Sequence, residues 1–161
     1  MSLDELIGRW RGSGYPTGHP FDGLLEDYGW YGKEILSPEV VHPLLFSGRA
    51  GAARPVDPGL APFALVRRAP RLARLPGVRQ TFGVVRPLLS TGRAAARVRL
   101  LEHRGAVTAA LIYDALPIID VLRRVDEDTL LGLMDMRGVR RPLFFLLRRD
   151  HPRVDSPAVP E

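Results

Sequence analysis

Three carboxylates and a tyrosine are the residues best suited to chemistry in this chain. Tyr113 and Asp114 end one predicted strand, Asp120 follows six residues later, and Asp135 ends another predicted strand. Strand ends surround the opening of a ligand-holding sheet, where an apolar environment can tune a carboxylate for acid–base catalysis. A structural interpretation is the alternative, because Asp114 and Asp120 flank Pro117 and can hold a turn by accepting backbone hydrogen bonds.

The four histidines do not form a metal-binding pattern. None of His19, His42, His103 and His151 lies in an i, i+4 pair, so we predict no metal site. Heme would need one histidine facing an apolar cavity, and His103, at the end of a predicted strand, is the candidate. We therefore expect no cofactor, with heme as the alternative.

Several other mechanisms lack their sequence signals. The chain has no cysteine, which excludes a thiol nucleophile and disulfides. No Gly-x-Ser-x-Gly elbow and no phosphate-binding loop is present. Neither a signal peptide nor a long apolar run is visible, so we expect a cytoplasmic protein.

The elements that position these residues are predominantly strands. Residues 97–103 and 106–113 alternate apolar and polar side chains around Arg104-Gly105, a typical hairpin turn. Residues 129–136 and 139–148 flank Arg137-Gly138 in the same way. Residues 118–125 fit a strand or a helix equally well. This half of the chain predicts an antiparallel sheet.

The N-terminal part predicts further strands. Residues 3–12 form a helical turn followed by a strand, and residues 30–35 and 40–46 form two more. Pro43 makes the third an edge strand or a bulged one, because proline cannot donate to the ladder. Residues 47–59, rich in Gly, Ala and Pro, predict a loop.

A basic segment separates the two halves. Nine arginines and no acidic residue lie between Pro58 and Leu101, and the prolines within it predict two or three short helices. Arg67, Arg71 and Arg74 share a helical face. This face can be solvated, can form a lid that meets an anionic head group, or can contact an anionic membrane. Nucleic-acid binding ranks last, because aromatic residues are few.

The spacing Gly8-x-Trp10-x-Gly12 is the most specific local motif. A Gly-x-Trp at the start of the first strand resembles the opening of lipocalins and related calycin barrels. That resemblance implies that Trp10 plugs one end of a barrel. It also implies that an arginine of the last strand, Arg148 or Arg149, packs over the indole as a cation–π contact.

Longer segments resemble a bacterial family. Residues 6–12 through 45–46 are similar to GXWXG proteins, and residues 97–105, 113–120 and 131–135 are similar to their usual partner, the domain of unknown function 4334. Nitrobindins, which are small heme-holding barrels, share only the Gly-x-Trp-x-Gly opening. The family implies no established activity.

These observations predict a mainly β, calycin-like (lipocalin-like) antiparallel β-barrel with a short-helical basic insert. Residues 1–150 form one domain, made of a GXWXG-like part (1–46), the insert (47–96) and C-terminal hairpins (97–150), and residues 151–161 form a disordered tail. The expected function is binding of a small hydrophobic or amphipathic ligand inside the barrel. The alternative is a cofactor-free isomerase, cyclase or hydratase that uses Asp114, Asp120 or Tyr113. The candidate ligand-binding residues are Tyr28, Trp30, His103, Tyr113, Asp114, Asp120 and Asp135.

Overall fold

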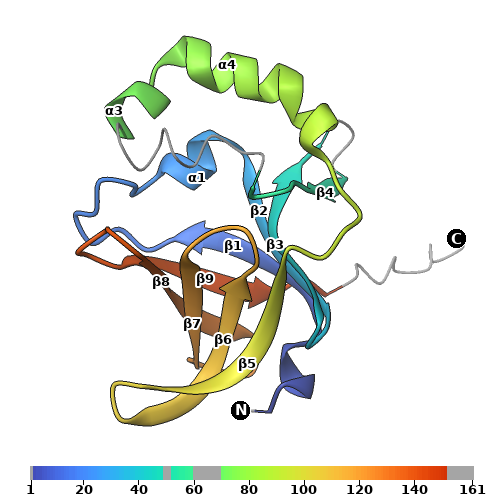
Figure 1. The fold of residues 1–161 in the computed structure, drawn as a ribbon, viewed down its shortest axis with the longest axis vertical. Coiled ribbons are helices and arrows are strands. Elements are labelled where there is room, and N and C mark those ends of the chain that lie inside the picture. Colours follow the sequence, from blue (N-terminus) through green and yellow to red (C-terminus); the bar gives the residue numbers. More distant parts are fainter. Residues whose placement is uncertain (1, 49–51, 60–69, 152–161) are drawn as a thin grey trace, which may run out of the picture.

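The fold is mainly β with few helices (Figure 1). A computed structural model describes residues 2–48, 52–59 and 70–151. The predicted roles of Arg67 and of the tail from residue 152 lie outside the described residues. The prediction of a mainly β, antiparallel architecture is confirmed.

The described strands form one nine-stranded antiparallel sheet in the order β2-β1-β9-β8-β7-β6-β5-β3-β4. An additional β2–β3 pairing brings the ends together, so that eight strands close into a ring and β4 lies beside β3. The strands are β1 (Gly8–Gly14), β2 (Trp30–Ser37), β3 (Val40–Ser47), β4 (Ala53–Pro55), β5 (Ala96–His103), β6 (Ala106–Tyr113), β7 (Ile118–Arg124), β8 (Thr129–Met136) and β9 (Leu143–Arg149).

The hairpin between β5 and β6 forms as the sequence predicts. Arg104 and Gly105 both have positive φ, 52° and 74°. Two such residues make the turn whose twist matches that of the flanking strands. Residues 118–125, which fitted a strand or a helix equally well, form the strand β7, which ends at Arg124.

One boundary of the predicted strands was wrong, and one open alternative is now decided. The last strand begins at Leu143 rather than at residue 139, because residues 140–142 bend ahead of it and Pro142 has no N–H to donate. The strand with Pro43 is not an edge strand, since β3 pairs with β2, β4 and β5. Its pairing with β2 is irregular, so the bulged alternative applies. The predicted loop 47–59 also contains β4.

One end of the ring is closed by the N-terminal 3-10 helix η1 (Asp4–Leu6) and by Trp10. The Trp10 Nε1–H donates to the Leu6 carbonyl over 2.8 Å. The Arg149 guanidinium lies 4.3 Å from the indole centroid and donates to the carbonyls of Glu5 and Ile7. Arg148, the other candidate for this contact, is exposed.

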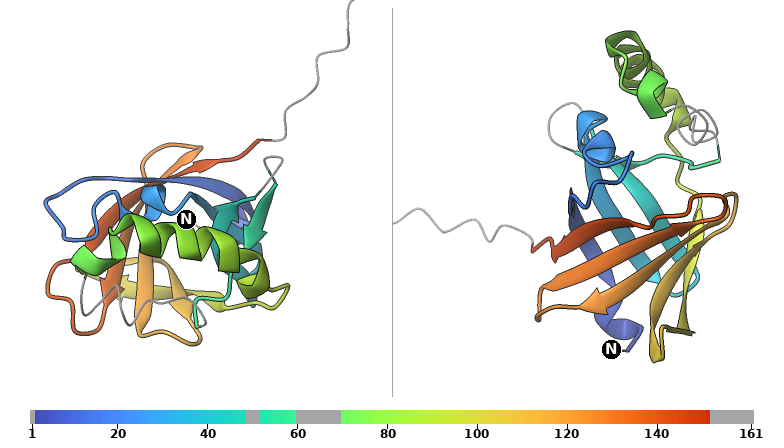
Figure 2. Two further views of the ribbon diagram at one scale, coloured as in Figure 1. Left: turned by 90° about the horizontal axis from the view of Figure 1, so that it is seen from above. Right: turned by 90° about the vertical axis from the view of Figure 1, so that its left-hand side faces the viewer.

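The opposite end carries the helices (Figure 2). They are α1 (Leu24–Asp27), α3 (Pro70–Ala73), α4 (Pro76–Val85) and the 3-10 helix η3 (Arg86–Leu89). The last three are short helices, as predicted, within the described residues 70–89 of the basic segment. Phe82 of α4 is buried and packs edge-to-face on Tyr28 and Phe46, with ring centroids 5.2 and 5.3 Å away. None of the helices described is long and apolar enough to cross a membrane.

Candidate functional site

A buried lysine spans the interior of the ring. Lys33 faces inward because it is the cross-strand partner of the buried Trp10, and paired residues of an antiparallel ladder share a face. Its Nζ lies 2.7 Å from Asp120 Oδ2, with 3% and 1% of the two side chains exposed. Lys33 is on β2 and Asp120 on β7, four strands away in either direction around the ring. The ion pair therefore bridges opposite walls.

Tyr113 completes a hydrogen-bonded triad with this pair. Lys33 Nζ donates to the Tyr113 hydroxyl and to the Pro43 carbonyl, each over 3.1 Å, and the Tyr113 hydroxyl donates to Asp120 Oδ2 over 3.0 Å. The three protons of the ammonium thus meet three acceptors. Burial, followed by the charge of Asp120 and the hydrogen bond to it, raises the pKa of Tyr113 well above its usual range. The neutral phenol is favoured by this shift, and it accepts from Lys33 while donating to Asp120.

Two buried polar atoms in this interior have no hydrogen-bond partner among the described residues. They are Asp120 Oδ1, an acceptor, and Trp30 Nε1, a donor. Leaving a buried polar atom unpaired costs about 1–3 kcal/mol. Each such atom in a native interior therefore needs an explanation, for which an ordered water molecule and a bound molecule are both candidates.

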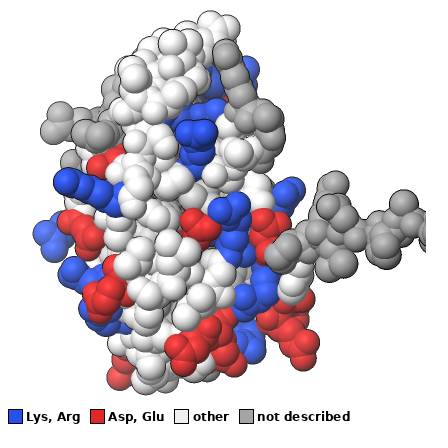
Figure 3. All heavy atoms as spheres, turned by 90° about the vertical axis from the view of Figure 1, so that its right-hand side faces the viewer, with Lys and Arg blue, Asp and Glu red and all other residues white. Residues whose placement is uncertain are grey.

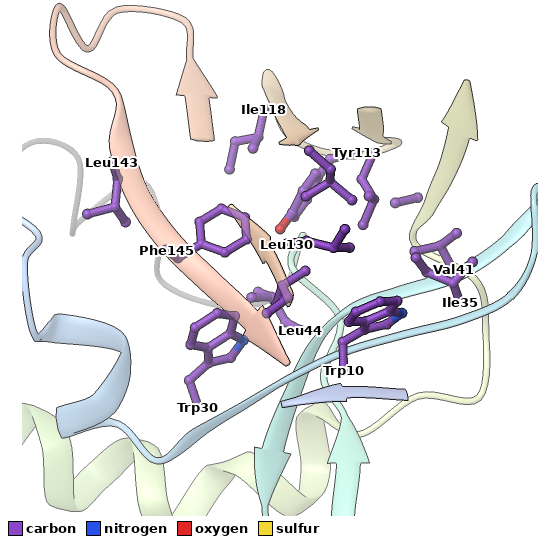
Figure 4. Packing of buried hydrophobic residues seen from close by; sticks show 14 of the residues in the cluster. Trp10, Trp30, Ile35, Val41, Leu44, Tyr113, Ile118, Leu130, Leu143 and Phe145 are labelled. Atoms are coloured by element: carbon purple, nitrogen blue, oxygen red, sulfur yellow. The ribbon is translucent and has the colours of Figure 1, made fainter. Parts of the chain in front are cut away.

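Aromatic rings form the walls around the ammonium. Lys33 Nζ lies 4.9 Å from the Phe145 ring, 5.6 Å from the Tyr113 ring and 5.7 Å from the Trp30 ring. Trp30 and Phe145 meet edge-to-face at 5.9 Å, and Figure 4 shows them facing the interior together with Tyr113. The site combines cation–π contacts with an otherwise apolar lining.

Two glycines make room for these rings. A Cβ atom on Gly12 would overlap the Trp30 ring, and a Cβ atom on Gly132 would overlap the Phe145 ring. Gly12 is the last residue of the Gly-x-Trp-x-Gly motif, whose three named residues all lie on the inner face of β1 because side chains alternate along a strand. The motif therefore shapes both the closed end and the aromatic wall.

The structure brings together three of the predicted site residues, Trp30, Tyr113 and Asp120. Tyr28 instead donates to the Ala73 carbonyl beneath α3 and contacts Phe82. Asp114 is exposed and pairs with an exposed arginine, Arg97, at 3.3 Å.

Two further candidates lie elsewhere. Asp135 is exposed on β8. His103 ends β5, and Ala96 at the opposite end of that strand is the residue paired with Tyr113. This separation is roughly 23 Å along the strand. The described residues contain no cluster of three or more His, Asp or Glu side chains able to hold a metal ion.

Sequence reasoning missed Lys33. The sequence does distinguish it, because it is the only lysine in the chain and directly follows a segment of aromatic residues and glycines, residues 28–32. What the sequence could not supply was the register that sets Lys33 opposite Trp10.

Chemically, the triad offers a carboxylate with one free oxygen, held beside a fixed positive charge and a neutral phenol. The indole N–H supplies a donor from the same interior. Such a set can hold a group that both donates and accepts a hydrogen bond, or can accept a proton from a bound molecule.

The chain resembles known proteins over most of its length. Residues 1–51 match the GXWXG protein family, and residues 94–149 match the domain of unknown function DUF4334. A crystal structure of a protein from Thermomonospora curvata is similar, with 30% sequence identity and a TM-score of 0.66. The alignment covers 92% of this chain and 78% of that one. None of the curated proteins compared with the chain matches it.

Proposed function

The chain belongs to the GXWXG proteins with a C-terminal DUF4334 region, and we propose that it binds a small, largely apolar molecule that carries a hydroxyl-like group. The observation that carries this proposal is the pair of free buried atoms, Asp120 Oδ1 and Trp30 Nε1. A hydroxyl donates to the first and accepts from the second.

The architecture supports this function. We interpret the ring as a calycin-like barrel, and a barrel of eight strands is of a size that holds one small ligand. Trp10 and Arg149 close one end, so the helical end is the entrance. An apolar pocket with a few convergent polar groups is the usual form of a small-molecule site.

Paired probes test the role of the polar group. Native mass spectrometry of the purified protein should reveal a retained small molecule. In titrations, 1-naphthol should bind roughly tenfold more tightly than naphthalene, because its hydroxyl gains a hydrogen bond to a charged group. Trp30→Phe should reduce that difference, whereas Tyr15→Phe, on an exposed residue, should leave it unchanged. Equal affinity for both probes in the wild type contradicts the proposal.

A second candidate is cofactor-free acid–base catalysis on such a molecule. It is favoured by the free Asp120 oxygen, which can remove a proton from a carbon next to a carbonyl group while the electron pair moves to the carbonyl oxygen. The Trp30 N–H is then a donor to the developing oxyanion, and the Lys33 charge stabilises it.

Deuterium exchange tests this candidate. The wild type should accelerate deuterium incorporation into 2-tetralone in D₂O, and Asp120→Asn should abolish the acceleration. Asp114→Asn, which changes an exposed carboxylate, is the matched control and should exchange like the wild type. Equal rates for the Asp120 variant and the wild type eliminate Asp120 as the base.

A further inference from the structure

A large groove lies at the helical end of the molecule. It has a volume of about 700 Å³ and lies between α4 and η3 on one side and β3 and β4 on the other. Its apolar lining includes Phe46, Val56, Val84 and Pro87, and two arginines, Arg54 and Arg86, complete it. Small-molecule sites typically measure about 300–1,000 Å³, so the groove can take a ligand of ordinary size.

The two arginines of the groove carry uncompensated charge. Neither the Arg54 nor the Arg86 guanidinium forms an ion pair or a hydrogen bond within the part of the chain that the structure describes. By contrast, Arg97 and Arg99 pair with Asp114 and Glu39. Free guanidinium groups beside an apolar wall are complementary to an anionic group attached to an apolar chain.

The arginines predicted for this role are placed differently. Arg74, directly after α3, donates to the carbonyls of Pro20 and Asp22. These contacts hold the end of α3 against the loop that precedes α1. Arg71 is exposed on α3. Figure 3 shows basic side chains in the hollow between the helical top of the molecule and the strands below it.

We propose that this groove binds an amphipathic anion, with its carboxylate or phosphate at Arg54 and Arg86 and its apolar chain along Phe46, Val56 and Val84. The inference stands apart from the interior site, although the two are adjacent. Phe46 is the cross-strand partner of Trp30, so the two rings share a face of the sheet and Phe46 lies where the groove meets the interior site.

Decanoate is the probe for this site, in calorimetric titrations of the full chain. The wild type should bind decanoate, and Arg54→Met/Arg86→Met should bind it at least tenfold more weakly. Arg93→Met, on an exposed arginine outside the groove, is the charge control and should bind like the wild type. Gly83→Leu should also abolish binding by filling the groove, and it should fold, because a Cβ atom there meets nothing within 4 Å.

Other ligands separate the possible sources of the anion. Methyl decanoate, which has neither the charge nor a hydroxyl group, should bind at least tenfold more weakly than decanoate, and inorganic phosphate alone should not bind measurably. If Gly83→Leu still binds phosphatidylglycerol vesicles, the arginines contact a membrane surface, and the proposal that the groove holds the anion is overturned. Tyr113→Phe should leave decanoate affinity unchanged, so a failure of the interior site is distinguishable from a failure of this one. Equal affinity of the double arginine variant and the wild type also overturns the proposal.

Discussion

The Lys33–Asp120 pair is costly to bury, and this cost determines how substitutions act. Two charges lose their hydration inside the ring, and their attraction offsets that loss only while both partners are present. Lys33→Met leaves the carboxylate alone in an apolar interior. We predict a loss of about 3–5 kcal/mol in the free energy of unfolding, measured by urea denaturation.

Two further variants test whether charge burial is the cause. Lys33→Met/Asp120→Leu removes both charges and should regain most of the lost stability. Arg9→Met breaks the exposed Arg9–Glu34 pair, which also spans 2.7 Å, and should cost about 0–1 kcal/mol. If Lys33→Met costs no more than Arg9→Met, the interior pair is not a buried ion pair in solution.

Individual residues of the site differed in how well the sequence predicted them. Tyr113 was identifiable because hairpin alternation fixes its strand. Asp120 was selected only as an acidic residue after Pro117, in a segment that fitted a strand or a helix equally well. Asp114 had the same local signals as Tyr113, yet it is exposed because it directly follows that residue at the end of β6. The side that each residue faces depends on where the strand ends, and local patterns leave that uncertain by a residue or more.

Among the elements, strand β1 leaves space for the Trp30 ring because Gly12 has no side chain. Gly12→Ala places a methyl group where the Trp30 ring lies, and both the strand and the ring are held by packing. We predict a loss of roughly 1–3 kcal/mol in the free energy of unfolding, with a shift in the tryptophan fluorescence maximum.

A glycine with free space around it is the control for this substitution. Gly92→Ala meets nothing within 4 Å and should change the free energy of unfolding by less than about 0.5 kcal/mol. Gly12→Ala behaving like Gly92→Ala is incompatible with the described position of Trp30.

The segment before α1 is fastened by a neutral histidine. The His19 ring accepts the Phe21 N–H at Nδ1, and Nε2 lies 3.0 Å from the Arg141 carbonyl in the β8–β9 connection. Burial lowers the pKa of His19 below that of an unfolded histidine, outweighing the opposite effect of the Arg141 carbonyl. The unfolded chain therefore binds a proton at His19 more readily than the folded chain does.

The sign of the pH effect follows from this difference. The stability that His19 contributes is present above its unfolded pKa, and it decreases as the pH falls through that value toward the lower, folded one. We predict that His19→Gln has a smaller loss of stability between pH 8 and pH 5 than the wild type, by urea denaturation at both values. An equal loss in the two proteins removes His19 as a cause. The difference between them at pH 8 measures the hydrogen bonds together with the edge-to-face contact of His19 and Phe21.

The elements that were predictable are those with a complete local signal. The β5–β6 hairpin has regular alternation and a turn whose two residues tolerate positive φ, so its bounds differ by at most one residue from those predicted. The start of β9 was missed, and the choice between an edge strand and a bulged strand for β3 stayed open, for one reason. Pro142 and Pro43 signal a disturbance, but only the neighbouring strands decide whether the disturbance ends a strand or is accommodated within it.

At the scale of the whole molecule, the two ends of the ring are closed by different means. Trp10, Arg149 and η1 close one end through buried contacts and hydrogen bonds between the chain's distant parts. Within the described residues, α3 and α4 contribute only two buried side chains to the helical end, Ala73 and Phe82, beside Phe21 and Leu24 at α1. An entrance is consistent with this asymmetry, because regions with little buried apolar surface open locally without global unfolding.

Phe82→Ala should therefore open the helical end and leave the ring intact. The variant removes the contacts of α4 with Tyr28 and Phe46, so amide hydrogens of residues 76–85 should exchange at least tenfold faster, while those of β6, β7 and β8 should keep their wild-type protection. Hydrogen exchange followed by mass spectrometry measures both regions in one experiment. Val84→Ala, on a side chain that is 78% exposed in the same helix, is the control and should exchange like the wild type. Equal acceleration in α4 and in β6–β8 means that helix and ring unfold together, and an entrance at this end is then excluded.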